Sequence, residues 1–289
     1  QETAYAAAYA ARARVRQDMS DYEAALADYN AAIELLPTHA PYYIDRGNVH
    51  ILLQNAEKAF ADFAAAIRLD STLASAYSGR AKAHALRGNL VEAIADYGRA
   101  IERDLENPDL YAARGVLHQE NGSADLALID LDKAVELSTA RGAEPAAMYL
   151  ARARVHEALG AFEDARSDYA RVVESEPANA SAFASLAATD AALGNIEDAL
   201  ASYSQAIEIE SGYTSAYVNR ARLYEKLGDY PRALADYTAA LEFDPENAQL
   251  LDSRASVYSL MGETAKALDD YASAIDLEPG RAATFANRG

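Results

Sequence analysis

The chain has 289 residues, with 26 Lys and Arg against 45 Asp and Glu, a formal net charge of −19, and neither Cys nor Trp. Because nucleic-acid binding begins with clustered Lys and Arg, this acidic excess argues against DNA and RNA as partners. Without Cys there is no disulfide framework, zinc ribbon or thiol nucleophile, and no apolar run approaches the roughly 18 residues of a membrane-spanning helix.

The compartment is left open by the sequence. The missing Cys and the first residue, Gln1 rather than Met, favour a mature exported protein, with a trimmed chain as the alternative.

An aromatic residue or Leu recurs every 34 positions, apart from one interval of 38. These residues are Tyr9, Tyr43, Tyr77, Tyr111, Tyr149, Phe183, Tyr217, Leu251 and Phe285. When each unit is counted from three residues before this position, the eighth and twentieth places are always Gly or Ala, and the twenty-fourth is Tyr, Phe or Leu. Two small residues allow two helices to approach closely, and the large side chain fills the remaining space. The sequence therefore predicts one array of repeats over residues 6–39, 40–73, 74–107, 108–141, 146–179, 180–213, 214–247 and 248–281.

In chain order, each unit is predicted to hold a first helix, a tight turn and a second helix. In the unit 214–247, apolar residues recur at helical spacing up to Tyr224, break at Gly228 and resume at Ala233. Gly recurs at this turn in the later units, where a left-handed residue ends the first helix. Four extra residues near 142–145 are predicted to make the turn over residues 138–145 longer, and a partial ninth unit occupies 282–289.

This pattern of aromatic, small, Gly, Ala, Tyr and Pro positions at a period of 34 resembles the tetratricopeptide repeat family. The resemblance implies an all-α, right-handed superhelical solenoid of antiparallel helix pairs, whose first helices line a concave groove. Members of the family commonly bind peptides or partner proteins there without catalysis.

A pair of charges recurs at the seventh and twenty-third places, which face each other across an antiparallel hairpin. The pairs are Arg12 with Asp28, Arg46 with Asp62, Arg80 with Asp96, Arg114 with Asp130, Arg152 with Asp168, Arg220 with Asp236, and Arg254 with Asp270. The sixth unit has Leu186 and Ser202 at these places, so both charges are lost together. We therefore predict structural salt bridges within each hairpin, and an anion-binding ladder of Arg residues is the weaker interpretation.

Four His residues share the eleventh place: His50, His84, His118 and His156. We expect them to pack between neighbouring helices. A pH-responsive row is the alternative. A metal site is disfavoured because no carboxylate recurs beside them in the sequence and because a catalytic zinc site needs three converging ligands.

The ninth place is expected to face the groove, and it is basic in every odd unit: Arg14, Lys82, Arg154 and Arg222. These residues form a predicted basic track for an acidic partner, while ordinary solvated side chains are the plain alternative. Asn48 occupies the same place in the second unit. Some family members clamp a C-terminal carboxylate with Lys and Asn, but Ile44 stands where that Lys belongs, so this mode is not predicted.

No Walker-type glycine run, His-Glu-x-x-His or Gly-x-Ser-x-Gly motif occurs in the sequence. We therefore predict a protein that is not an enzyme and has no cofactor or metal. Asn121 and Asn179 match the short glycosylation pattern, which carries little information because such matches arise by chance.

Two functions remain open: a scaffold whose groove binds a protein or peptide, and a structural subunit that stacks head to tail into a filament. The second interpretation uses the unfinished ends, with Tyr5 and Tyr9 at one end and Phe285 and Arg288 at the other. A window cut from a longer array would explain the same ends.

Overall fold

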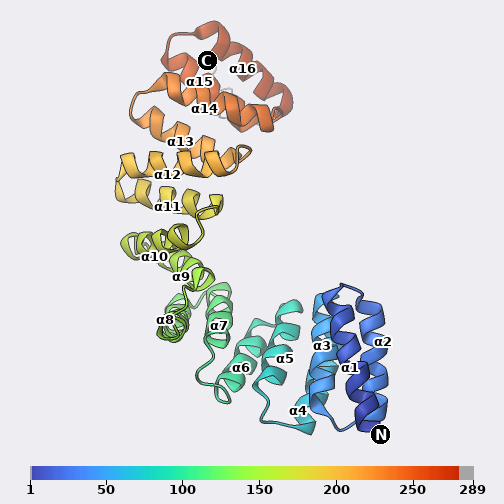
Figure 1. Cartoon of the computed structure of the whole chain (residues 1–289). Coiled ribbons are helices and arrows are strands. Elements are labelled where there is room, and N and C mark those ends of the chain that lie inside the picture. The colour runs from blue at the N-terminus through green and yellow to red at the C-terminus, as the bar shows by residue number, and fades with distance from the viewer. Residues whose placement is uncertain (1, 280–289) are drawn as a thin grey trace. The chain divides into compact units, whose positions relative to one another are not determined.

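The computed structural model describes residues 2–279, and within them every regular element is an α-helix (Figure 1). The helices are α1 (Glu2–Asp18), α2 (Tyr22–Leu35), α3 (Ala40–Leu52), α4 (Ala56–Leu69), α5 (Ala74–Leu86), α6 (Leu90–Ile101), α7 (Pro108–Glu120), α8 (Ala124–Ala140), α9 (Ala146–Ala158), α10 (Phe162–Ser175), α11 (Ala180–Leu193), α12 (Ile196–Ile209), α13 (Thr214–Lys226), α14 (Tyr230–Phe243), α15 (Ala248–Leu260) and α16 (Thr264–Leu277). None of these helices is both long and apolar enough to span a membrane.

The helix ends follow from local sequence chemistry. Asn and Asp side chains cap the N-termini of several helices; for example, the Asn55 carboxamide oxygen accepts a hydrogen bond from the Lys58 N–H at the start of α4. The turn after a first helix needs one residue with positive φ, and Gly228 supplies it between α13 and α14 with φ of 74°. In the first two hairpins Ser20 and Gln54 adopt the same left-handed conformation, with φ of 61° and 57°.

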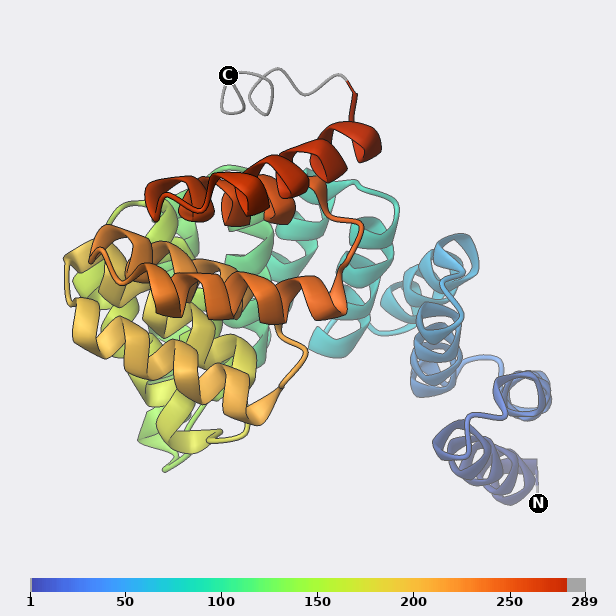
Figure 2. The ribbon, with the colours of Figure 1, turned by 90° about the horizontal axis from the view of Figure 1, so that it is seen from above.

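Consecutive helices pack as antiparallel hairpins, as Figures 1 and 2 show. In the hairpin α3–α4 the fully buried Phe63 ring lies against Gly47, where an added Cβ would come within 2.9 Å of the ring. The same ring contacts Gly79 of α5, where a Cβ would approach to 2.2 Å. Small residues therefore let one aromatic side chain join two successive hairpins. The predicted fold class, an all-α solenoid of helix pairs, is confirmed.

The chain divides into two compact units, one up to Val155 and one from His156 onwards. In the first unit α2 packs on α3, α4 on α5 and α6 on α7, and the first helices α3 and α5 are in direct contact. In the second unit α10 packs on α11, α12 on α13 and α14 on α15, and α11 contacts α13. Each unit thus buries a continuous core by stacking one hairpin on the next.

The long turn predicted over residues 138–145 is shorter in the structure. Helix α8 continues to Ala140, so Ser138 is helical and buried. The reversal begins only at Gly142, which has φ of 75°. The Arg141 guanidinium donates a hydrogen bond to the Glu106 carbonyl oxygen of the preceding loop. Helix extension therefore takes up part of the insertion, because it keeps backbone hydrogen bonds satisfied where the chain is buried.

Candidate functional site

The first helices of the first unit enclose a hollow of about 520 Å³, which we call the Tyr97 hollow. It is lined by Ile51 of α3, by Lys82, Ala85 and Leu86 of α5, by Tyr97 of α6, and by Ala113, Val116, Leu117 and Glu120 of α7. Its walls are apolar, and one cation and one anion belong to its lining. The hollow lies on the face that the sequence predicts for the groove, since Lys82 and Val116 both occupy the ninth place of their units.

The side chain at the twelfth place can supply a hydrogen-bond partner for the Tyr at the twenty-fourth place. In two hairpins this place is Glu, and the Tyr hydroxyl donates a hydrogen bond to it: Tyr169 to Glu157 at 2.5 Å, and Tyr237 to Glu225. In α5 the twelfth place is Ala85. The short Ala side chain leaves space above Tyr97 and gives its hydroxyl no carboxylate.

The predicted groove residues lie on different helices and have different partners. Arg14 of α1 donates a hydrogen bond to Asp45 of the next hairpin at 2.9 Å, so its charge is already compensated. Within residues 2–279, Lys82 of α5 and Arg154 of α9 are exposed and form no ion pair. In the second unit, Arg222 contacts the Asn219 side chain at 3.5 Å and lines a separate hollow of about 350 Å³. Asn48 is half-buried in α3. Of these five residues only Lys82 lies at the Tyr97 hollow.

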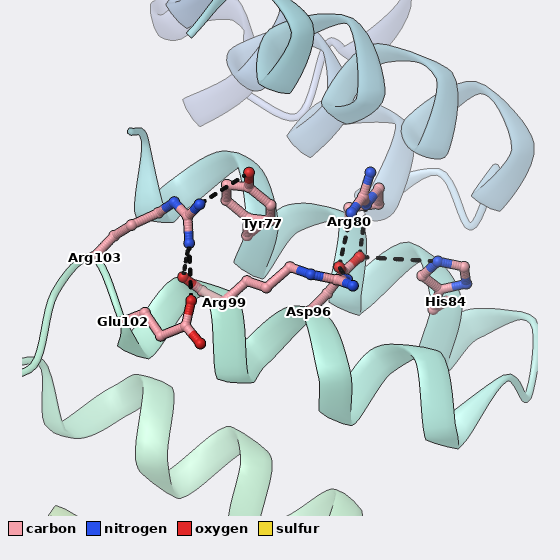
Figure 3. A network of polar contacts seen from close by, with 7 residues as sticks. All are labelled: Tyr77, Arg80, His84, Asp96, Arg99, Glu102 and Arg103. Atoms are coloured by element: carbon pink, nitrogen blue, oxygen red, sulfur yellow. Dashed lines mark hydrogen bonds and ion pairs between the residues drawn. The ribbon is translucent and has the colours of Figure 1, made fainter. Parts of the chain in front are cut away.

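The structure brings together the Arg and Asp side chains of the predicted structural pairs. Arg80 holds Asp96 with two hydrogen bonds of 2.6 and 2.8 Å, and Arg99 adds a third of 2.5 Å (Figure 3). Burial alone raises the pKa of Asp96, but the hydrogen bonds and charges of Arg80 and Arg99 outweigh it and hold that pKa below its usual value.

Five further pairs have the same two-bond geometry, and the two members of each pair lie in the same compact unit. They are Arg12–Asp28, Arg46–Asp62, Arg114–Asp130, Arg220–Asp236 and Arg254–Asp270. Because the guanidinium forks are occupied by carboxylates, these Arg residues do not offer an anion-binding ladder. Arg152 and Asp168 belong to the two different units, and Arg152 binds Asp132 at 2.7 Å.

The structure places a carboxylate near three of the His residues, although none recurs beside them in the sequence. The Nε2 atoms of His50, His84 and His118 lie 3.9–4.0 Å from the carboxylates of Asp62, Asp96 and Asp130. The carboxylate comes from the opposite helix of the hairpin, so its approach is not visible in the linear sequence.

These His side chains are enclosed, and burial changes the pKa of two of them. Burial lowers the pKa of His50 and His118, although the neighbouring Asp acts in the opposite direction. The Nδ1 atoms of all three rings are buried without a hydrogen-bond partner. Among residues 2–279 no three metal-ligating side chains gather in one place.

A buried acid in the sixth hairpin was missed by the sequence analysis. Asp190 of α11 accepts a hydrogen bond of 2.5 Å from Arg166 of α10, in the preceding hairpin, and another of 3.3 Å from Asn195. Asp190 occupies the eleventh place of its unit, which is His in four other units, and this departure was the one signal in the sequence. The partner Arg lies outside the recurring pair, so the spacing rule did not find it.

The predicted interface residues at the two ends are only partly covered by the structure. Tyr5 is 61% exposed and forms, with Ala8, Tyr9 and Arg12, a hollow of about 270 Å³ on α1. Phe285 and Arg288 lie outside the described residues.

Comparison with known proteins identifies the same repeat along the chain. Family profiles described as tetratricopeptide repeat match residues 10–74, 146–179 and 214–247, and one described as TPR repeat matches residues 82–122 and 189–228. No curated protein sequence matches the chain.

Several solved structures are similar to the chain. The structure of YrrB, described as a TPR protein with an unusual peptide-binding site, is 29% identical, with a TM-score of 0.56 over 65% of this chain and 95% of YrrB. The C-terminal part of a TPR repeat-containing protein from Cytophaga hutchinsonii is 19% identical, with a TM-score of 0.70 over 84% of this chain and 98% of that one. A chain of the APC/C hetero-tetramer Cut9–Hcn1 is 14% identical, with a TM-score of 0.55 over 92% of this chain and 52% of that one. The similarity to the last two structures supports the fold alone.

Proposed function

The chain belongs to the tetratricopeptide repeat family, and from that premise we propose that it binds a segment of a partner protein along the face lined by its first helices. The observation that carries this proposal is the Tyr97 hollow, an apolar recess between α3, α5 and α7 with a charged residue on two of those helices. Concave apolar sites with a few polar groups are where proteins receive ligands.

The relation to YrrB supports a peptide as the ligand. YrrB is 29% identical to this chain over 65% of its length and is described as having a peptide-binding site. A stack of helices offers a long surface on which an extended or helical segment can lie, and main-chain groups of such a segment stay accessible to water or polar side chains. The proposed role is binding without catalysis or a cofactor.

A peptide-display selection on the immobilised full chain tests this function directly. We expect selected peptides to bind saturably, and to lose most binding when Lys82 and Arg154 are both replaced by Glu if the basic track attracts acidic groups. Both side chains are exposed, so the melting temperature should change little. Failure to select any peptide would contradict the proposed function, whereas binding that survives the double replacement would remove only the basic track.

A head-to-tail filament is the second candidate function. It is favoured by the exposed hollow on α1, where Tyr5 and Ala8 present apolar surface next to Arg12. An interface between unlike ends is heterologous and propagates if the rotation does not close. Sedimentation over a concentration series should then show growth that stops when Tyr5 and Ala8 are both replaced by Asp, and a monomer at about 100 μM would exclude this assembly.

A further inference from the structure

We propose that the Tyr97 hollow receives one bulky apolar side chain of the bound segment, with an acidic residue of that segment over α5 and a basic residue over α7. This inference rests on the proposed function and specifies the chemistry of the partner at one place in the groove.

The apolar walls select the central side chain. Ile51, Leu86 and Val116 approach the hollow from three different first helices, and Leu86 is 40% exposed. Ala85 and Ala113 keep the space between them open. About 520 Å³ lies within the roughly 300–1,000 Å³ of recesses that bind ligand groups. A large aliphatic or aromatic side chain would cover this exposed apolar surface, which is the main source of favourable free energy in such contacts.

The Tyr97 hydroxyl adds one directional polar group to this apolar site. Tyr97 is 5% exposed, and its hydroxyl makes no hydrogen bond within residues 2–279. Tyr169 and Tyr237, at the equivalent place of two other hairpins, donate to a Glu. Burial raises the pKa of Tyr97 to about 12, so it remains a neutral phenol and a hydrogen-bond donor. The hydroxyl is not fully buried, so in the free chain it still reaches solvent at the hollow. A segment that displaces this solvent has to supply an acceptor, because an unpaired donor in a closed contact is costly, and a backbone carbonyl next to the inserted side chain would supply it.

The charges in the lining favour one order of acidic and basic residues along the bound segment. Lys82 of α5 and Glu120 of α7 are exposed, and neither forms an ion pair with the other or with any residue of the described range. Arg14, at the same place as Lys82 in the first hairpin, is by contrast neutralised by Asp45. An acidic residue near Lys82 and a basic residue near Glu120 would each complete a pair, and the opposite order would place like charges together.

The experiment uses the full chain and two capped synthetic peptides of identical composition. Both carry one Trp at the centre. The first has Glu two residues before the Trp and Lys two residues after it, and the second exchanges Glu and Lys. Because the chain has 19 Tyr but no Trp, excitation at the long-wavelength edge of Trp absorption, where Tyr does not absorb, reports the peptide alone. Entry of the Trp ring into an apolar recess shifts its emission to shorter wavelength.

We expect a saturable blue shift with one peptide preferred by about three- to fivefold, the range that two exposed charge pairs provide. In the chain with Lys82→Glu and Glu120→Lys the preference should reverse. This reversal does not depend on knowing the direction of the peptide backbone. Tyr97→Phe should weaken the binding of both peptides by about threefold, because one hydrogen bond is lost.

Two variants that close or charge the hollow complete the test. Ala85→Leu fills the space with a good helix-forming residue, and Val116→Asp places a charge in the apolar wall; each should abolish the shift. Ala188→Asp alters the equivalent ninth place in α11 and should leave binding unchanged. Circular dichroism checks that each variant keeps its helices.

The inference is overturned if neither peptide gives a saturable shift, if Ala85→Leu binds as well as the unaltered chain, or if the charge exchange leaves the preference as it was. Peptides selected in the display experiment distinguish this failure from failure of the proposed function. If selected peptides bind the chain but are insensitive to Ala85→Leu, the groove binds elsewhere and only the assignment of the Tyr97 hollow is wrong.

Discussion

The hairpins α3–α4 and α11–α12 have the same shape but different buried charges. In α3–α4, Arg46 holds Asp62 with two hydrogen bonds of 2.9 and 2.5 Å within the hairpin. In α11–α12 the equivalent residues are Leu186 and Ser202, and the buried acid is Asp190, which is bound by Arg166 of the preceding hairpin. The charge interaction has therefore moved from within one hairpin to the junction between two.

What stays constant between these hairpins is the packing of small residues against one ring. Ala187 and Ala199 are fully buried around Tyr203, as Gly47 and Ala59 are around Phe63. The hairpin therefore depends on close packing, while the ion pair satisfies a buried carboxylate and is placed wherever an Arg can reach it. A buried pair is weak evidence for net stability, but removing one partner is costly.

The largest expected effect tests the role of packing in both hairpins. Phe63→Ala and Tyr203→Ala should each lower the free energy of unfolding by about 3–5 kcal/mol, because each leaves a cavity at a side chain that is buried against two helices. Urea unfolding followed by circular dichroism measures the loss. A much smaller loss in α11–α12 than in α3–α4 would show that the two cores are not equivalent.

Removal of one charge from the pair in α3–α4 should have the next largest effect. Arg46→Ala or Asp62→Ala should cost about 1–3 kcal/mol, since either change leaves a mostly buried group without its partner. The double variant should fall well short of the sum of the two single losses. Additive losses in this double-mutant cycle would mean that the two side chains do not interact.

A transplant of the pair into α11–α12 sharpens the comparison further. Ser202→Asp alone should cost about 1–2 kcal/mol, because it introduces a carboxylate where the hairpin has no Arg of its own. Adding Leu186→Arg should recover most of this loss by restoring the two-bond geometry of the other hairpins. If the second substitution makes the loss larger, Asp190 and the new Arg compete for the same space.

The smallest expected effect is a pH dependence that α3–α4 has and α11–α12 lacks. Burial lowers the pKa of His50, Lys58 and Arg46 lower it further, and Asp62 only partly opposes them. The folded chain therefore binds this proton less readily than the unfolded chain, whose His has an ordinary pKa of about 6.5. The stabilisation is complete above that value and is lost as the pH falls through the lowered folded-state pKa.

His118 of α7 should contribute in the same direction, because burial lowers its pKa as well. Unfolding midpoints measured between about pH 7.5 and 5.5, above the ordinary titration range of carboxylates, should fall with pH. The variant His50→Gln with His118→Gln should show a flatter profile. In α11 the equivalent place is Asp190, and Asp190→Asn should leave the slope over this range unchanged.

Repetition in the sequence carried most of the information about the fold. The period of 34, the Gly before the second helix and the small residues at the eighth and twentieth places predicted the helix pairs, because helix formation and hairpin packing depend on short-range spacing. The prediction that the seventh and twenty-third places face each other followed from the geometry of an antiparallel hairpin, and the structure places those side chains together. The lengthened α8 was not predicted, because helix propensity alone does not say whether an inserted segment will be buried.

By itself, the sequence determined the all-α class, the order of the hairpins and the residues that could meet within one hairpin. Only the tertiary structure decided which side chains meet between hairpins, such as Asp45 with Arg14 and Arg166 with Asp190. It also decided that the Tyr97 hydroxyl, beside Ala85 at the hollow, forms no hydrogen bond within residues 2–279. The physical reason is that spacing along a helix fixes the direction of a side chain, whereas its partner on the next hairpin depends on side-chain length, on competing partners and on the space that neighbouring small residues leave.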